Sequence, residues 1–82
     1  MDMVSEIQRR RVAADISQAD LAYALGRSPA WVGGVERGIL PITAETKDKI
    51  LRAIERLAAH RAEVRRAREA IAEDNRLPKV GV

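Results

Sequence analysis

Few side chains in this sequence could carry out covalent or metal chemistry. There is no cysteine, and His60 is the only histidine and has no partner at metal-ligand spacing. Ser17, Ser28 and Thr43 each precede a helical pattern, where a hydroxyl group caps the helix and is not left free to act as a nucleophile. We therefore expect no catalytic residue, no metal site, no cofactor and no small-molecule ligand, and we predict that the protein is not an enzyme.

The basic side chains could instead bind phosphate groups. Twelve of the 15 basic residues are arginine, whose planar fork matches phosphate geometry, and the net charge is +3. Residues 1–44 hold five basic and five acidic side chains, whereas residues 45–82 hold ten and seven, so the excess lies entirely in the second half. This charge balance fits a nucleic-acid partner.

The composition indicates the class of fold. A chain of 82 residues forms a single domain, and its only aromatic residues are Tyr23 and Trp31. Because aromatic residues are scarce and long runs of β-branched residues are missing, the core must be built from Ala, Leu, Ile and Val on helices. No apolar stretch approaches the roughly 18 residues of a membrane span, and the N-terminus lacks the apolar segment of a signal peptide. We expect an all-α cytoplasmic protein, associated with the nucleoid and not with a membrane.

The first part of the chain contains signals for two helices and the turn between them. The apolar spacing predicts a helix over residues 4–14, and Asp15 follows where the chain must turn. Ser17 to Asp20 form a capping box, in which the serine caps a second helix and Asp20 can reach back to its start.

The signals that follow predict a third helix close to the second. Gly26 suits the end of the second helix, and Ser28-Pro29 suit the start of another that ends at Gly38. Two short helices joined by the three-residue turn Gly26-Arg27-Ser28 have the geometry of a helix-turn-helix.

The remainder of the chain favours one long helix. Thr43 is its expected cap, and residues 44–75 contain neither Gly nor Pro. Val64 and Ile71 continue a seven-residue apolar repeat beyond the reach of a four-helix core. On a monomer these two side chains would be exposed, so we expect them to be dimerisation contacts. The competing interpretation is a break near His60, after which a fifth helix folds back. We divide the chain into a helix-turn-helix domain at 1–58, a helical continuation for dimerisation at 59–76 and a flexible tail at 77–82.

Three segments in register resemble the lambda-repressor/Cro-like (XRE) helix-turn-helix family. They comprise residues 11–22, with a Ser-Gln pair before Leu-Ala, residues 25–32, with the turn glycine, and residues 35–38, with Glu-Arg-Gly closing the third helix. The resemblance covers residues 5–57. It implies a four- to five-helix lambda-repressor-like domain, here with an extended C-terminal helix, that binds double-stranded DNA. Family members are usually repressors or other regulators that bind two-fold symmetric operators as dimers.

The resemblance also implies roles for individual residues. Gln18 would bond a DNA phosphate at the start of the second helix, and Arg37 would lie near the DNA backbone. Arg11 and Glu36 would form a structural ion pair. Trp31 either contacts sugar and phosphate or packs in the core or a dimer contact. The residues that we expect to contact DNA are Gln18, Arg27, Ser28, Pro29, Ala30, Trp31, Gly33, Gly34 and Arg37.

The groove-facing positions depart from the usual pattern. In this family they often carry Gln, Arg, Ser or Asn, whose side chains distinguish bases, but here they are Pro29, Ala30, Gly33 and Gly34. Either the backbone approaches its target closely at the two glycines, or this helix reads little sequence. We predict a dimeric, sequence-specific DNA-binding regulator, a repressor of phage or bacterial type. The alternatives are a protein-interaction module of the antitoxin or adaptor kind and a weakly specific architectural DNA binder.

Overall fold

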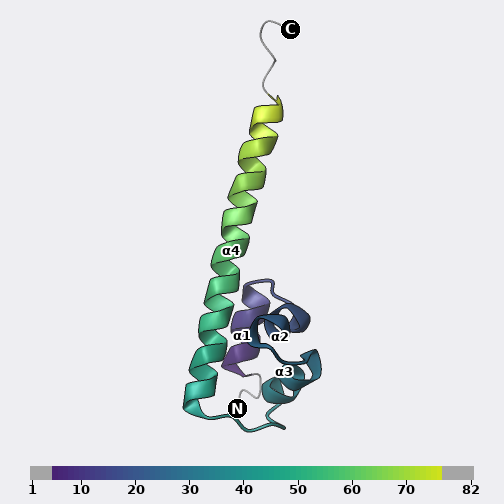
Figure 1. Ribbon diagram of the computed structural model, residues 1–82, viewed down its shortest axis with the longest axis vertical. Helices are drawn as coiled ribbons and strands as arrows, with labels where there is room; N and C mark the ends of the chain where they lie inside the picture. The colour runs from purple at the N-terminus through teal and green to yellow at the C-terminus, as the bar shows by residue number, and fades with distance from the viewer. Residues whose placement is uncertain (1–4, 77–82) are drawn as a thin grey trace, which may run out of the picture.

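The computed structural model describes residues 5–76, with side chains through residue 73, and all regular structure in this part of the chain is helical (Figure 1). The helices are α1 (Glu6–Ala13), α2 (Gln18–Leu25), α3 (Pro29–Glu36) and α4 (Ala44–Arg76). The first three lie together against the N-terminal half of α4, whose second half extends beyond them (Figure 1). The expected all-α fold with an extended C-terminal helix is confirmed. The tail predicted at 77–82 lies outside the described residues.

Local capping interactions set the starts of the short helices. The hydroxyl group of Ser5 accepts a hydrogen bond from the backbone N–H of Gln8 at 3.0 Å. Ser17 and Ser28 accept equivalent bonds from residues three positions ahead, at 2.9 and 3.1 Å. Each hydroxyl satisfies one of the N–H groups that a helix start leaves without an intrahelical partner.

Residues with positive φ make the two tight turns. Asp15, between α1 and α2, has a φ of 59°, a conformation that aspartate tolerates better than most residues. Gly26 ends α2 in the left-handed conformation, with a φ of 68° and its N–H directed to the carbonyl groups of Ala22 and Tyr23. These turns bring α1, α2 and α3 into one compact group.

The core is aliphatic and lies where the three short helices meet the first half of α4. Leu21, Val32 and Ile50 are its largest fully buried side chains. Trp31 and Leu57 are partly buried against it. The complete set of buried apolar residues is Ile7, Ile16, Leu21, Ala22, Val32, Val35, Ile50, Ala53 and Ile54. Since α4 contributes three of them, its first half is part of the same core as the helix-turn-helix.

The long helix is continuous from Ala44 to Arg76. The alternative of a break near His60 and a fifth helix that folds back is therefore wrong. No Gly or Pro interrupts this stretch, and Asp48 pairs with Arg52 at 2.8 Å, one turn apart on the exposed face. None of the described helices is both long and apolar enough to cross a membrane.

Candidate nucleic-acid interface

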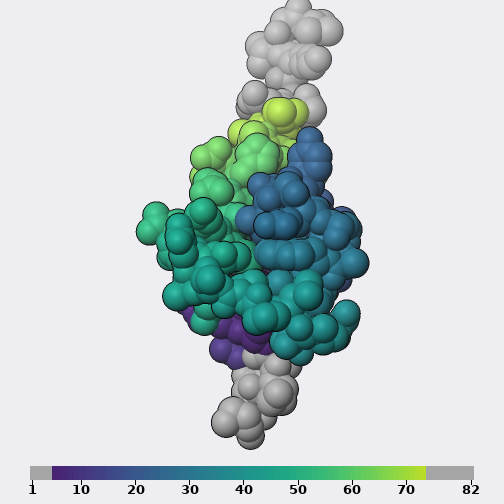
Figure 2. Space-filling model, turned by 60° about the horizontal axis from the view of Figure 1, so that its bottom comes forward, coloured from purple at the N-terminus to yellow at the C-terminus, as the bar shows by residue number. Residues whose placement is uncertain are grey.

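The surfaces of α2 and α3 adjoin each other, with the start of α2 beside the end of α3. Figure 2 shows the surface of α2 and α3 to one side of the start of α4, with the loop after α3 continuing it. The helix starts at Ser17 and Ser28 place backbone N–H groups and positive helix-dipole ends on the molecule's exterior. Such groups bind anions, and a DNA phosphate is one of them.

A buried ion pair joins α1 to the end of α3. Arg11 Nε lies 2.6 Å from Glu36 Oε2, and Arg11 Nη2 donates to Glu36 Oε1 at 3.0 Å. The same guanidinium donates through Nη1 to the backbone carbonyl of Ile16 at 2.8 Å. Both side chains are nearly excluded from water, so each charge depends on the other for compensation.

The amide of Gln18 belongs to the same network. Its Nε2 donates a hydrogen bond to Glu36 Oε1 at 3.0 Å, which orients the side chain at the start of α2. A primary amide carries two N–H donors, so the second remains for a ligand. Gln18 is half-buried, and it is the polar side chain that the buried pair positions most directly.

Two of the residues expected to contact DNA, Gly33 and Gly34, are buried in the structure. A Cβ atom at Gly33 would lie 3.4 Å from Nη1 of Arg37 and 3.6 Å from Nε2 of Gln18. A Cβ atom at Gly34 would lie only 2.8 Å from Cδ1 of Leu40. The glycines therefore provide space in which side chains from elsewhere cover α3.

The start of α3 remains exposed. Ser28, Pro29 and Ala30 are accessible to solvent, although the hydroxyl group of Ser28 already serves as the helix cap. The guanidinium carbon of Arg27 lies 4.9 Å from the centre of the Trp31 ring, in a cation–π contact. Trp31 thus packs partly on the core and partly beneath a surface arginine.

Arg37, the last of the residues expected at DNA, caps the end of α3. It is exposed, and no acidic side chain in the described part of the chain pairs with it. The candidate surface thus contains Gln18, Arg27, Pro29, Ala30 and Arg37. Gly33 and Gly34 are buried and do not form part of it.

A contact between distant residues ties α2 to the second half of α4. Arg61 Nη2 lies 2.8 Å from Asp20 Oδ2, and Arg61 Nη1 lies 3.9 Å from Asp15 Oδ2. The carboxylate of Asp20 is therefore directed to α4 and does not reach back to the start of α2. No local pattern signals this pair, because the two residues are 41 positions apart.

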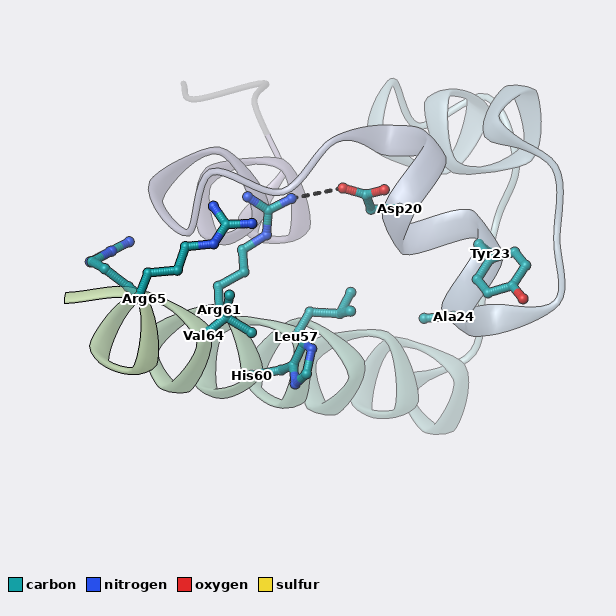
Figure 3. A pocket seen from close by; sticks show the side chains of 9 residues that line it. Asp20, Tyr23, Ala24, Leu57, His60, Arg61, Val64 and Arg65 are labelled. Atoms are coloured by element: carbon teal, nitrogen blue, oxygen red, sulfur yellow. Dashed lines mark hydrogen bonds and ion pairs between the residues drawn. The ribbon is translucent and has the colours of Figure 1, made fainter. Parts of the chain in front are cut away.

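Beside this ion pair lies a groove of about 580 Å³ between α2 and α4 (Figure 3). Tyr23 and Ala24 line it from α2, and Leu57, His60 and Val64 line it from α4. Val64 is half-buried here, which differs from its expected exposure, because it lies in the groove that α4 forms with α2. Ile71, farther along α4, is 60% exposed as expected.

Comparison with known proteins gives one finding that agrees with this geometry. A family model described as a helix-turn-helix domain matches residues 2–67. Comparison with curated proteins and with solved structures gives no match. The matched region contains α1, α2 and α3 and continues into the second half of α4.

Proposed function

The chain belongs to the helix-turn-helix domain family, and on this premise we propose that it is a sequence-specific DNA-binding regulator that acts as a homodimer. The observation that carries the proposal is the Gln18 amide, held at the start of α2 by the buried carboxylate of Glu36. Its regulatory effect is repression, of the phage or bacterial type, because a protein bound in the major groove excludes other proteins from the same DNA.

In the proposed complex α3 enters the major groove with its N-terminal end foremost. Gln18 and the first N–H groups of α2 bind a phosphate on one side of the groove. Arg27 and Ser28 lie at the turn, where a second phosphate approaches. Pro29 and Ala30 face the bases, and the methyl group of Ala30 suits contact with a thymine methyl. The buried Arg11–Glu36 pair keeps α1, α2 and α3 in the arrangement that this docking requires.

The dimer forms through the second half of α4. Ile71 is 60% exposed on a helix that extends beyond its own domain, and an apolar side chain there gains burial from a second copy. Val64 lies two helical turns earlier on the same seven-residue repeat and adds to this contact. In this proposal residues 1–58 form the DNA-binding domain and residues 59–76 form the helical continuation that dimerises.

Ile71→Asp tests the dimer because a charge at this contact would be buried in the interface. We expect sedimentation equilibrium to report a dimer for the unaltered protein and a monomer for this variant. Ala59→Asp, at an exposed position on another face of α4, is the matched control and should remain dimeric. A monomeric unaltered protein would contradict the proposed homodimer.

Selection from a random pool of duplex DNA at about 150 mM salt tests the function, because non-specific phosphate attraction weakens steeply with salt. We expect enrichment of a two-fold symmetric site whose half-site spacing reflects the dimer. Binding without enrichment would instead indicate an architectural DNA binder. That outcome has one structural argument in its favour, since Pro29 and Ala30 carry no side-chain hydrogen-bond donor.

A protein-interaction module is the second candidate. The observation in its favour is the groove between α2 and α4, where the Tyr23 side chain is 89% exposed beside the apolar Leu57 and Val64. In this case the DNA pool would not be retained at any salt concentration, and the DNA-binding proposal would be wrong.

A further inference from the structure

The side chain of Arg37 lies over Gly33 on the outer side of α3. Arg37 follows Gly33 by one helical turn, and its backbone N–H donates to the carbonyl group of Gly33 at 3.0 Å. Its Nη1 would lie 3.4 Å from a Cβ atom at position 33, at van der Waals distance. The guanidinium therefore occupies the neighbourhood that a side chain at position 33 would take.

Gly33 itself was expected to face the DNA groove, so the residue that covers it takes over that position. The amide of Gln18 lies at the opposite side of the same space, with its Nε2 3.6 Å from the Cβ position. Glu36 holds this amide, but no acidic side chain in the described structure neutralises Arg37. A cation without a counterion is thus directed across the face of α3 that the proposed docking turns toward DNA.

The other exposed groups of α3 cannot read bases by hydrogen bonding. Pro29 and Ala30 have no polar side-chain atoms. Arg27 stacks on Trp31 at the opposite end of the helix, with 4.9 Å between the guanidinium carbon and the ring centre. Arg37 is the guanidinium that remains beside the groove-facing part of α3.

We propose that Arg37 reads a base by hydrogen bonding, in place of the backbone contact that the family resemblance implies, and that it recognises a guanine in the major groove. A guanidinium presents parallel N–H donors that match the O6 and N7 acceptors of guanine, and no other base offers two acceptors at that spacing on this edge. The absence of a side chain at Gly33 leaves the space in which Arg37 lies across the helix. This inference rests on the proposed DNA-binding function.

The test uses the site selected by the full-length protein. We expect one guanine to be invariant in each half-site, and replacing it with 7-deazaguanine, which lacks the N7 acceptor, should weaken binding by about fivefold or more. Arg37→Lys should weaken the preference for guanine while it retains the salt dependence of binding, because lysine keeps the charge but loses the planar fork that matches both acceptors. Arg37→Ala should lose the preference and become insensitive to 7-deazaguanine.

Arg27→Ala is the matched control, since it removes another exposed arginine and should keep the response to 7-deazaguanine. Arg37 is exposed at the end of its helix, so these variants should unfold at the same urea concentration as the unaltered protein. Arg37→Ala could instead weaken binding to all sequences equally, lower the salt slope of binding by about one and leave the base preference unchanged. This result would show that Arg37 contacts a phosphate, and the proposal would be wrong. A selected site without a guanine also overturns it. If the protein retained no DNA at all, both the proposed function and this inference would be wrong. This outcome differs from failure of the inference alone, because no binding site would be selected.

Discussion

Gln18 and Glu36 are joined by a hydrogen bond of 3.0 Å between the amide Nε2 and the carboxylate Oε1. The same oxygen accepts a bond of 3.0 Å from Nη2 of Arg11. A surface amide at the start of α2 and a buried ion pair between α1 and α3 are therefore parts of one network. Because the carboxylate is fixed by its buried partner, it restricts the amide to a narrow range of orientations, which lowers the entropy that Gln18 loses when it binds a phosphate.

Gln18→Ala removes the proposed phosphate contact but leaves the ion pair intact. We expect DNA affinity, measured by fluorescence anisotropy, to fall about tenfold, because a hydrogen bond to a charged group contributes about 1.5 kcal/mol. The free energy of unfolding in urea should change little, since Glu36 keeps Arg11 as its partner. Gln8→Ala, which removes the other glutamine of the chain from α1, should bind DNA like the unaltered protein. Equal affinity for both variants would contradict the docking at α2.

Arg11→Met removes one member of the buried pair and leaves the carboxylate of Glu36 without compensation. We expect the free energy of unfolding to fall by about 3–5 kcal/mol in urea denaturation. Adding Glu36→Leu should recover most of this loss, because two apolar side chains need no charge partner. The recovery should be incomplete, since the carbonyl group of Ile16 still lacks the bond that Arg11 supplied. A double variant as unstable as Arg11→Met alone would show that the two charges are not coupled.

Gly34→Ala should destabilise the protein even though alanine is the better helix former. The new Cβ would lie 2.8 Å from Cδ1 and 3.0 Å from Cγ of Leu40, so the leucine must move. Overpacking of this kind costs about 1–3 kcal/mol, and alanine recovers about 1 kcal/mol of helix propensity, so we expect a net loss of about 1 kcal/mol in urea denaturation.

A double-mutant cycle separates the two effects at Gly34. In a Leu40→Ala background the space is open, and Gly34→Ala should then stabilise the protein by about 1 kcal/mol. The same substitution at Gly33 serves as a comparison, because its Cβ would meet Arg37 and Gln18 only at 3.4 Å and beyond. If Gly34→Ala is equally destabilising with and without Leu40, the loop does not limit the size of this residue.

The contact between α1 and α4 should depend on pH through Glu6. Its carboxylate lies 3.0 Å from Lys47 Nζ, and the hydrogen bond and charge of Lys47, assisted by Arg10, lower its pKa below the usual 4.5. A lowered pKa in the folded state stabilises the protein above pH 4.5, and this contribution disappears as the pH falls through the lowered value. The melting temperature of Glu6→Gln should therefore be lower than that of the unaltered protein at pH 7, and the difference should disappear under acid conditions. Glu55→Gln, an exposed substitution on α4, should have the same melting temperature as the unaltered protein at every pH if the effect belongs to Glu6.

Several local features of the fold were predictable because the interactions that cause them span only a few residues. The hydroxyl groups of Ser17 and Ser28 cap α2 and α3 through bonds to residues three positions ahead. Asp15 and Gly26 make their turns with the positive φ values that their residue types tolerate. Predictions of this kind need no knowledge of what lies across the fold.

The features that were missed depend on residues far apart in the chain. Asp20 was expected to complete a capping box, but its carboxylate pairs with Arg61, 41 positions away. The burial of Gly33 and Gly34 beneath Arg37 and Leu40 was not predicted, because it depends on how the loop after α3 returns across the helix. Spacing alone also left open whether the chain breaks near His60.

The sequence by itself determined the four helices, the turns between the short ones and the membership of the helix-turn-helix family, because caps, turn residues and apolar spacing are local and mutually consistent. Only the tertiary structure decided which polar groups remain at the candidate interface. Packing directs Gln18 to Glu36, Asp20 to Arg61 and Arg37 across Gly33, and a side chain's exposure is set by the elements that pack over it. For this reason the proposal that Arg37 reads a base rests on the fold and not on the sequence of α3 alone.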